Sequence, residues 1–340
     1  MYEFNCVTDD RFQWQLMDKC HGHNVFKTGE WMEFLRKACH VEPFVVAIYC
    51  KGDVIGYFVG EKIKKGISIV ASPFEGCTTS FQGLNMLIEI TPEERVKIYE
   101  SLAVYLFRAR QCLLFQVADW KMNIPDLEHS WLKYEPISGF TIDITQPEEV
   151  ILGNFHTSTR KNVRKSERMG VIVRQAENLD KFIDDYYRQL TDVFGRQGLK
   201  PTYPKKRVEA LIDAIYPTGN LLLLESVTAA GDTVATKLSI GKNDFASSWG
   251  QASYTASHSL FPNEALWFEA LCYWKRAGMK EYELGGGGTY KTKYGGVPYV
   301  KPRIVAAKYE VLHKMKQLVK WNYYFTRKVL SGVRPKQAKG

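Results

Sequence analysis

The chain has 340 residues, of which 45% are hydrophobic and 13% aromatic, and its formal net charge at pH 7 is +9. This composition supplies enough apolar side chains for packed cores and excludes a globally disordered chain. No apolar run reaches the roughly 18 residues that a membrane-spanning helix needs, so a spanning segment is excluded as well.

The first residues and the cysteines indicate a cytoplasmic protein. Residues 1–14 are acidic and polar, where a signal peptide would be basic and then apolar. Seven cysteines are scattered singly without a CxxC pair, a distribution typical of reduced thiols. His21 and His23 lie close together but lack a third ligand nearby, and we therefore expect no metal.

The first half of the chain alternates helical and strand patterns. Residues 29–38 carry a helical stripe of apolar side chains, and residues 43–63 are typical of a hairpin around a Gly-Asp turn. The segment TPEE at 91–94 is a capping box with proline at the first helical position. It predicts a helix up to about residue 110, followed by an apolar strand over 112–118.

The second half repeats this plan. Residues 220–242 predict a second hairpin around a Gly-Asp turn, followed by a strand over 244–254, a helix over 263–276 and a short strand over 281–285. An internal duplication is the simplest explanation. We predict an α/β (α+β) fold of two similar halves that pack closely, each a mixed twisted sheet flanked by helices, with the active cleft between or beside them.

The predicted division of the chain has three parts. Residues 1–150 form an N-terminal half that serves as scaffold and acceptor side, and residues 151–310 form a catalytic C-terminal half. Residues 311–340 form a basic helix and tail, because they contain eight Lys and Arg residues and no Asp or Glu. The rest of the chain therefore has a net charge of about +1.

A candidate binding segment begins where the predicted strand ends, near Tyr254. We expect the next helix to have Asn263 as its N-cap, with Pro262 before it and Glu264 in its first turn. Exposed amides at a helix N-terminus bind phosphate and other anions. An ordinary capped helix is the alternative.

Four consecutive glycines, residues 285–288, follow Glu283. Such a run has a high conformational entropy cost and is tolerated where the backbone approaches a ligand closely or moves. Lysines and tyrosines alternate directly after it, which favours a binding wall for a negatively charged substrate; a flexible loop without function is the alternative. The candidate binding residues of this segment are Gly286, Gly287, Tyr290, Lys293 and Tyr294.

A basic helix is predicted upstream. Arg160, Arg164 and Arg168 are four residues apart and share one helix face, while Lys161 and Lys165 share another. Arg160 and Arg164 are candidate substrate-binding residues. A solvated basic face is the alternative.

Together these segments resemble the Fem-type acyltransferases of the GNAT superfamily. That group includes the peptidoglycan-bridge aminoacyl transferases and the BioF2-like acetyltransferases of polysaccharide loci. The matching positions are Pro262, the aromatic-rich helix after it, the strand 282–285 and the segment 290–296. The basic helix matches a second motif, so the resemblance covers roughly residues 155–310.

The resemblance implies tandem GNAT-like domains and acyl transfer to an amine. Lys291 falls on the family's lysine, which implies stabilisation of the oxyanion or binding of phosphate near the acyl carbon. One fixed donor at a developing negative charge typically stabilises the transition state by about 2.7–4 kcal/mol. The amine nucleophile must lose a proton, and Glu283, Asp119 and Glu264 are the candidate general bases.

We therefore predict an N-acyltransferase that moves an acetyl-type group from acyl-CoA to an amine of a cell-envelope precursor, such as an amino sugar or a peptide stem. Aminoacyl-tRNA is the alternative donor, favoured by the basic helix and tail and by the lack of the usual Arg/Gln-x-x-Gly-x-Gly/Ala pyrophosphate loop. A non-catalytic protein that binds envelope precursors is the alternative from a different class.

The basic tail predicts partners of its own. A helix over 308–330 has an apolar stripe that we expect to dock on the body, with aromatic and basic residues interleaved near its end. This pattern suits peripheral contact with the anionic inner face of the membrane, where a lipid-linked acceptor would lie, or binding of tRNA. A solvated, disordered end is the alternative.

Overall fold

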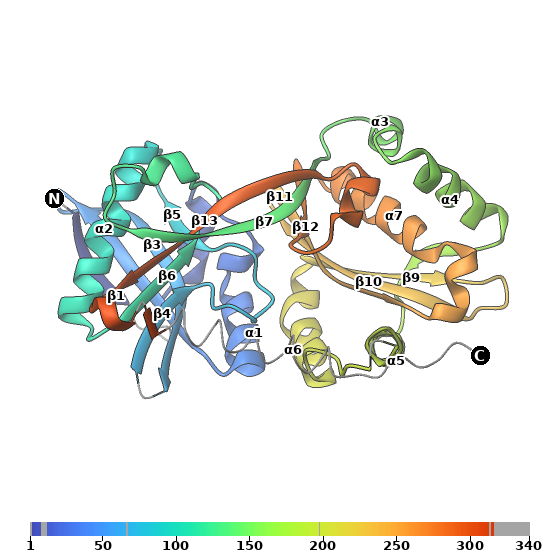
Figure 1. Cartoon of the computed structure of the whole chain (residues 1–340), viewed down its shortest axis with the longest axis horizontal. Coiled ribbons are helices and arrows are strands. Elements are labelled where there is room, and N and C mark those ends of the chain that lie inside the picture. The colour runs from blue at the N-terminus through green and yellow to red at the C-terminus, as the bar shows by residue number, and fades with distance from the viewer. Residues whose placement is uncertain (1, 8–11, 66, 197, 313, 316–340) are drawn as a thin grey trace.

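The structure, a computed structural model, describes residues 2–7, 12–65, 67–196, 198–312 and 314–315. Within this part of the chain, thirteen strands form one continuous sheet in the order β1-β2-β3-β4-β6-β13-β7-β12-β11-β10-β9-β8, with β5 paired to β3. Figure 1 shows two halves, each with its own helices, joined by the two long strands β7 and β13.

The first half has its strands between two groups of helices. The predicted helix over 29–38, the hairpin over 43–63 and the helix that begins at residue 92 are confirmed. The strands are β1 (Tyr2–Val7), β2 (Glu42–Cys50), β3 (Asp53–Lys65), β4 (Ile67–Ser72), β5 (Gly83–Met86) and β6 (Leu114–Ala118); the helices are α1 (Gly29–Cys39) and α2 (Pro92–Ala109), with 3-10 turns η2 (Trp14–Lys19), η3 (Val25–Lys27) and η4 (Ile124–Leu127).

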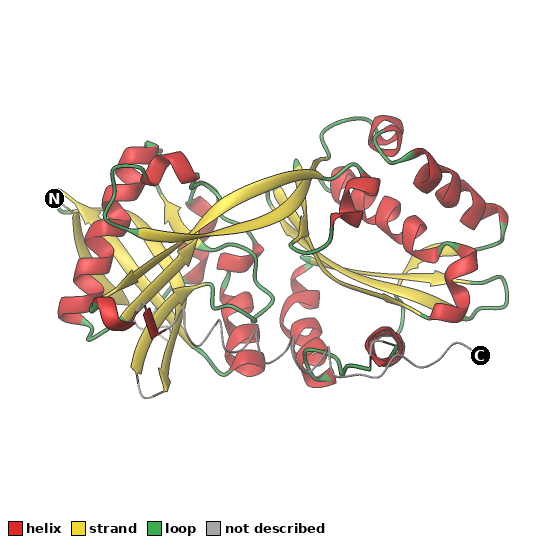
Figure 2. Ribbon diagram, in the orientation of Figure 1, coloured by secondary structure: helices red, strands yellow, loops and turns green. Residues whose placement is uncertain are grey.

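In the second half, α7 contacts β9 and β10 and has α4 packed beside it, while α5 packs on β10 and β11 and carries α6 (Figure 2). The predicted hairpin over 220–242 and the elements after it are confirmed. The strands are β8 (Ile172–Gln175), β9 (Leu221–Val227), β10 (Thr233–Lys242), β11 (Phe245–Ser253) and β12 (Glu281–Gly285); the helices are α3 (Glu148–Gly153), α4 (Thr157–Arg168), α5 (Leu179–Gly195), α6 (Lys205–Ile215) and α7 (Pro262–Arg276), with 3-10 turns η5 (Tyr216–Thr218), η6 (Thr255–Leu260) and η7 (Thr289–Tyr294).

The long strands β7 (Lys133–Asp143) and β13 (Val297–Ala307) belong to both halves. They pair antiparallel with each other, β7 then pairs with β12 in the second half, and β13 pairs with β6 in the first. The two predicted halves therefore share one sheet, since β13 comes from the second half of the chain and completes the sheet of the first. A local sequence pattern does not show which distant strand fills a sheet edge.

Short-range signals explain why the individual elements form. Thr91 accepts a hydrogen bond from the Glu94 amide while the Glu94 carboxylate accepts one from the Thr91 amide, which is the predicted capping box. The turn between β2 and β3 has positive φ at Lys51 (55°) and Gly52 (91°). Two consecutive positive φ values are typical of the tight turns that match the twist of a hairpin.

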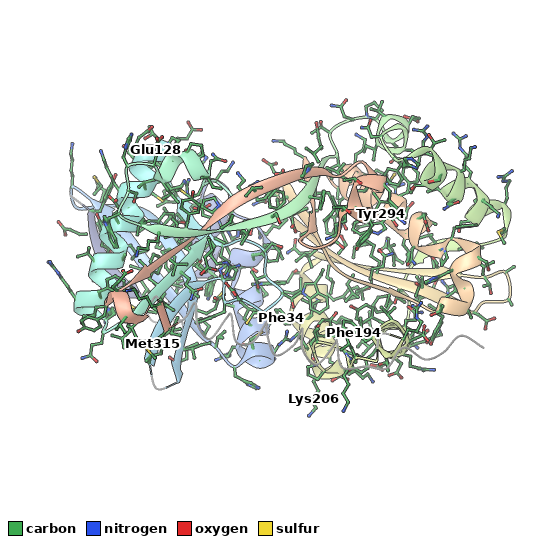
Figure 3. All side chains as sticks on the ribbon, viewed as in Figure 1. Phe34, Glu128, Phe194, Lys206, Tyr294 and Met315 are labelled. Carbon is green, nitrogen blue, oxygen red and sulfur yellow. The ribbon has the colours of Figure 1, made fainter. Side chains whose placement is uncertain are left out.

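A hydrophobic core spans the two halves and holds them together. Trp31 and Phe34 of α1 are fully buried in the same cluster as Leu211 of α6 and Leu238 of β10. Figure 3 shows side chains filling both halves and the region where α1 faces α6. The halves pack closely, as predicted, and their relative placement is fixed by packed apolar side chains.

The predicted C-terminal helix lies almost entirely outside the described residues. Residues 310–312 are helical, and Val311 and Met315 of the predicted docking stripe are exposed. In the part of the chain that the structure describes, no helix combines the length and the apolar character needed to cross a membrane.

Candidate active site

A cavity of about 810 Å³ lies where the two halves meet. The loop between β4 and β5 and residues within β7 and β13 contribute to it from one side, and β11, β12 and the glycine loop contribute from the other. Among its lining residues are Phe74, Ser80, Phe81, Tyr203, Arg207, Ser247, Ser248, Trp249, Gln251, Trp267, Glu283, Gly285, Gly286, Tyr290, Lys291, Tyr299 and Arg303.

The cavity opens where two parallel strands diverge. β11 and β12 pair only from Phe245 opposite Glu281 to Ser247 opposite Glu283. β11 then continues to Ser253, whereas β12 has a register shift after Glu283 and ends at Gly285. The residues of β11 beyond Ser247 therefore line the cavity at the carboxyl ends of the two strands.

Glu283 is the buried carboxylate of this cavity, with 1% of its surface exposed. Its Oε2 accepts hydrogen bonds from Ser80 (3.0 Å) and Ser247 (2.7 Å), and its Oε1 accepts one from Tyr299 (2.8 Å). Burial, followed by the negative charge of Glu283, raises the pKa of the Tyr299 hydroxyl. Tyr299 therefore stays a hydrogen-bond donor, and three hydroxyls hold the carboxylate in one orientation.

Lys291, the predicted oxyanion stabiliser, lines the same cavity and is 6% exposed. Its ammonium donates to the carbonyls of Leu284 (2.6 Å), Gly285 (2.9 Å) and Gly286. Burial lowers the pKa of Lys291, and the nearby carboxylate of Glu283 opposes this shift. All three N–H groups of Lys291 donate to carbonyls of the glycine loop. Its role in stabilising the oxyanion stays a prediction, and it requires that one of these hydrogen bonds opens.

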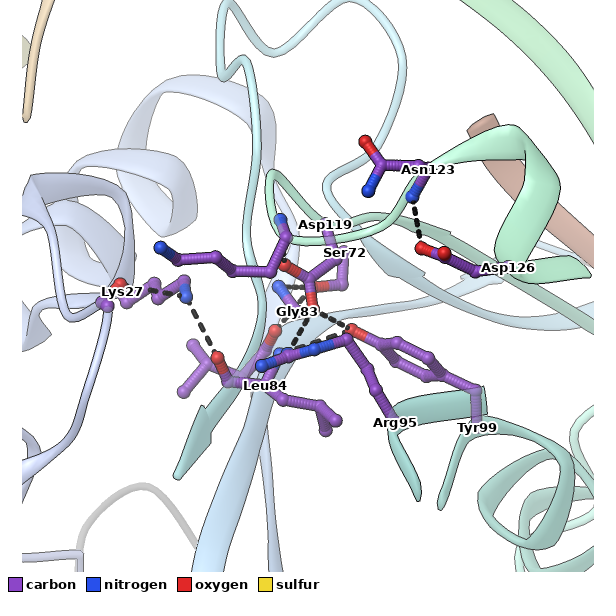
Figure 4. A network of polar contacts seen from close by, with 12 residues as sticks. Lys27, Ser72, Gly83, Leu84, Arg95, Tyr99, Asp119, Asn123 and Asp126 are labelled. Atoms are coloured by element: carbon purple, nitrogen blue, oxygen red, sulfur yellow. Dashed lines mark hydrogen bonds and ion pairs between the residues drawn. The ribbon is translucent and has the colours of Figure 1, made fainter. Parts of the chain in front are cut away.

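Asp119, the third predicted catalytic residue, lies elsewhere. It follows β6 and lines a separate cavity of about 710 Å³, where its carboxylate accepts from Arg95 (2.8 Å) and Tyr99 (2.6 Å) (Figure 4). Although burial alone raises the pKa of Asp119, Arg95, Lys27 and the hydrogen bonds hold it below its usual value. We therefore correct the prediction: Asp119 joins α2 to β6 and is not grouped with Glu283, because chain order does not show which loop faces which cavity.

A second cavity, of about 470 Å³, adjoins the first on the side of α7. It brings together predicted residues from two separate segments, and Lys293 lies 3.5 Å from the carboxylate of Glu264. Tyr294 is buried against Trp267, with ring centroids 5.1 Å apart. The predicted residues that line this cavity are Asn263, Glu264, Tyr290, Lys293 and Tyr294.

The predicted capping role of Asn263 is wrong. Phe261 is the N-cap residue of α7, with φ of 55°, and Pro262 is in the first turn, so Asn263 is already helical. Its side chain instead donates to Ser253 (2.9 Å) and accepts from Gln251 (2.8 Å). The helix begins with proline at its first position, so the cap lies two residues earlier than predicted and the side chain of Asn263 faces the cavity wall.

Other predicted binding residues lie outside both cavity linings. Arg160 donates to the carbonyls of Gly153 and Phe155 and so closes the turn between α3 and α4. Arg164 is on the exposed face of α4, and Tyr254 precedes η6 as its N-cap residue. Gly286 lies in the first cavity as predicted, whereas Gly287 is in the loop beyond it, with φ of 98°.

Several residues of the site carry no signal in the sequence. Ser80 and Tyr299 come from segments far from Glu283 in the chain, and single serines or tyrosines have no diagnostic spacing. Lys237 is a lysine in the middle of a buried strand and is itself fully buried. That placement is itself a signal, because lysine is almost never fully buried unless it is paired. Among the described residues, no group of three or more His, Cys, Asp or Glu side chains could hold a metal ion.

Comparison with known proteins agrees with this geometry. Residues 153–294 match the family "Acetyltransferase (GNAT) domain". The fold is similar to the crystal structure of FemX, with a TM-score of 0.72 and 11% identity over 92% of this chain and 99% of that one. The comparison with curated proteins gave no match.

Two further structures share the fold with TM-scores above 0.5. A tandem GNAT protein from the clavulanic acid biosynthesis pathway has a TM-score of 0.54 and 11% identity, over 90% of this chain and 98% of that one. L-PGS from Bacillus licheniformis has a TM-score of 0.52 and 12% identity, over 86% of this chain and 90% of that one. The likeness along the whole chain is one of fold, and it includes a tandem arrangement of two GNAT domains.

Proposed function

We propose that the protein, of which residues 153–294 match the GNAT acetyltransferase domain, moves an acetyl-type group from acyl-CoA to the amine of a cell-envelope precursor, such as an amino sugar or a peptide stem. The observation that carries this proposal is the carboxylate of Glu283, buried in the wall of the cavity between the halves. A cavity lined by a small number of precisely placed polar groups is characteristic of binding and active sites.

Glu283 suits the role of general base. An ammonium acceptor must lose a proton before its nitrogen can form a bond to the acyl carbon. A carboxylate has about four acceptor sites, and hydroxyls of Ser80, Ser247 and Tyr299 occupy three of them. The remaining site can take the proton as the C–N bond forms, and the C–S bond of the thioester then breaks to release the thiolate of CoA.

The walls of the first cavity fit a polar acceptor with an extended ring or chain. Aromatic side chains form much of the wall, and the ring centroids of Tyr203 and Trp249 lie 5.3 Å apart. Arg207 and Arg303 add positive charge next to them. Aromatic surface with a few placed polar groups is typical of a site that binds and orients a small molecule, and the cations favour an acceptor that also carries phosphate or carboxylate.

The second cavity fits the donor. It lies at the N-terminal end of α7, where free amides and the helix dipole favour an anion such as the pyrophosphate of CoA. Lys165 of the neighbouring α4 lies 4.8 Å from the ring centroid of Phe261, at the edge of this cavity. A donor bound here would place its acyl end toward Gln251 and Trp267, which line both cavities.

One observation favours aminoacyl-tRNA as a second candidate donor. Four basic residues of α4 are exposed beside the second cavity: Lys161, Arg164, Lys165 and Arg168. A row of exposed cations next to a donor cavity suits the phosphates of CoA and, over a longer distance, the backbone of tRNA. The salt dependence of binding separates the two, because tRNA would release many more counterions.

The test is a melting curve with saturating acetyl-CoA, followed by a thiol-release assay with amino sugars and peptide amines. A ligand at 100 times its dissociation constant stabilises a protein by about 2.7 kcal/mol, which raises the melting temperature by several degrees. A rise together with amine-dependent thiol release supports the proposal. If only aminoacyl-tRNA stabilises the protein, the donor is wrong, and if neither ligand acts, the proposed function is wrong.

The cell-envelope acceptor also suggests where the protein works. We propose that it acts on the cytoplasmic side and reaches a lipid-linked acceptor through peripheral contact of the basic residues 311–340 with anionic lipids. Sedimentation with anionic liposomes, for the full chain and for a chain that ends at Leu330, tests this contact. Equal and salt-insensitive sedimentation of both proteins would contradict it.

A further inference from the structure

Lys237 on β10 is a fully buried lysine, with 0% of its surface exposed. Its ammonium donates to Ser248 Oγ (2.9 Å) and to Gln251 Oε1 (3.2 Å), and it lies 3.3 Å from the ring centroid of Trp267. No carboxylate of the described residues forms an ion pair with it. A buried ammonium without a counter-ion is costly, so the stability of the fold does not explain its presence.

The partners of Lys237 form the wall between the two cavities. Ser248 lines the first cavity, whereas Gln251 and Trp267 line both. An acyl group that passes from a donor in the second cavity to an amine beside Glu283 has to cross this wall. Lys237 lies directly behind that crossing point, where a small misplacement of the reacting groups has a large effect on rate.

A chain of hydrogen bonds runs from Lys237 along the second cavity. Gln251 Nε2 donates to Asn263 Oδ1 (2.8 Å), and Asn263 Nδ2 donates to Ser253 Oγ (2.9 Å). Ser253 Oγ is in turn 3.1 Å from His258 Nε2. Lys237 donates through its N–H groups, so it holds the amide oxygen of Gln251 toward itself and thereby sets the orientation of each amide after it.

The surroundings of Lys237 bear on its charge. Lys291, the other lysine of the site, has its three N–H groups on the glycine loop. Burial, together with the charge of Lys291, lowers the pKa of Lys237 well below its usual value, as expected for a cation that lacks a partner. A lowered pKa favours the neutral amine, and the amine keeps the N–H groups that donate to Ser248 and Gln251.

We propose that Lys237 is a positioning residue of the acyl-transfer site, which orients Gln251 and holds Trp267 so that the wall between the two cavities keeps one arrangement against the acyl end of the donor. This inference rests on the proposed function for the identity of the donor. The arrangement of the wall does not depend on the proposed function. The positioning role of Lys237 and the identity of the donor can therefore be tested separately.

The test compares Lys237→Met with Lys242→Met in the full chain. Lys242 is on the same strand but pairs with Asp18 at 2.9 Å, away from the cavities, so it is a matched control. Calorimetric titration with acetyl-CoA is expected to give about a tenfold weaker affinity for Lys237→Met and for Gln251→Leu, and an unchanged affinity for Lys242→Met. Melting temperatures verify that each variant is folded.

A second measurement does not need the donor. The indole ¹⁵N resonance of Trp267, assigned with Trp267→Phe, is expected to shift in Lys237→Met and to stay in place in Lys242→Met. If the wild type binds acetyl-CoA and Lys237→Met binds it equally well, the proposal is wrong. If the wild type does not bind acetyl-CoA, the proposed donor is wrong, and the positioning role is then judged from the Trp267 resonance alone. A shift of that resonance in Lys237→Met supports the positioning role, and an unmoved resonance overturns it.

Discussion

Two buried glutamates contact the loop between β4 and β5, and their partners give them different chemistry. Glu61 accepts a hydrogen bond from the amide of Phe74 at 3.0 Å, whereas Glu283 accepts one from Ser80 in the same loop and two more from other hydroxyls. Burial raises the pKa of Glu61 to about 8, so this side chain is mostly protonated at neutral pH. Glu61 therefore supports the loop, whereas Glu283 lines the cavity in which an acceptor amine would lie.

The first residue-scale prediction concerns Glu283→Gln. The amide keeps the size of the side chain but cannot take the proton of the acceptor, and general-base catalysis typically contributes 10²–10⁴-fold. We expect at least about a hundredfold loss of turnover with little change in melting temperature. Glu269→Gln, an exposed change on α7 where Glu269 pairs with Arg276, is the control, and equal activity of both variants would contradict the assignment.

The second residue-scale prediction concerns pH. Because the pKa of Glu61 is raised from 4.5 to about 8 in the folded state, its contribution to stability is fully present below pH 4.5 and is lost as the pH rises to about 8. Glu61→Gln is neutral throughout, so it should match the wild type near pH 4 and be more stable at pH 7, by up to about 3 kcal/mol. Denaturant unfolding at both values measures this, and a difference that does not depend on pH would contradict it.

At the scale of elements, the site is built where strands end. β11 and β12 part after three paired residues, and η7 returns Lys291 under the glycine loop that follows β12. Gly285 and Gly287 have φ of 80° and 98°, which side chains rarely adopt, so these glycines are required by the path of the loop. The ammonium of Lys291 stabilises that path from below.

The element-scale prediction is that Lys291→Met loosens the glycine loop. With three carbonyl contacts removed, the amides of residues 284–291 should exchange with solvent at least about tenfold faster, and activity should fall as well. Hydrogen exchange followed by mass spectrometry measures this. Lys293→Met, which removes the contacts to Glu264 and to the ring of Tyr294, is the control, and unchanged exchange in Lys291→Met would indicate that Lys291 acts on the substrate alone.

At the scale of the whole molecule, the exchange of β7 and β13 makes the halves dependent on each other. Strand β13 pairs with β7 over nine residues and places its last five residues beside β6. The cavity with Glu283 is formed by residues of both halves, including Ser80 from the first and Ser247 from the second. Neither half by itself contains the complete site.

The whole-molecule prediction is that residues 1–150 and 151–340, made as separate chains, do not fold alone. Without β13, the first fragment has unpaired edges at β6 and β7, which favours aggregation. Produced together, the fragments should copurify and unfold in one transition, followed by circular dichroism. A cooperative unfolding transition of residues 1–150 alone would contradict this prediction.

The sequence by itself determined the local elements and the region of the chemistry. The capping box at Thr91, the Gly-Asp turns and the helix after Pro262 depend on contacts within a few residues, which periodicity and turn chemistry reveal. Lys291 and Glu283 were found through a motif in one continuous segment, and both line the same cavity. Contacts between residues close in sequence can be predicted from the sequence pattern, because few alternative local structures compete with them.

The tertiary structure alone decided which distant residues complete the site. Ser80 and Tyr299 reach Glu283 from separate segments, Asp119 is directed to another cavity, and Lys237 gains its position from the helix packed over β10. The exchange of β13 into the first half likewise has no local signature. Such contacts join residues far apart in the chain. The entropy cost of closing a long loop differs little between one distant partner and another, so the packing of the whole core selects the partner.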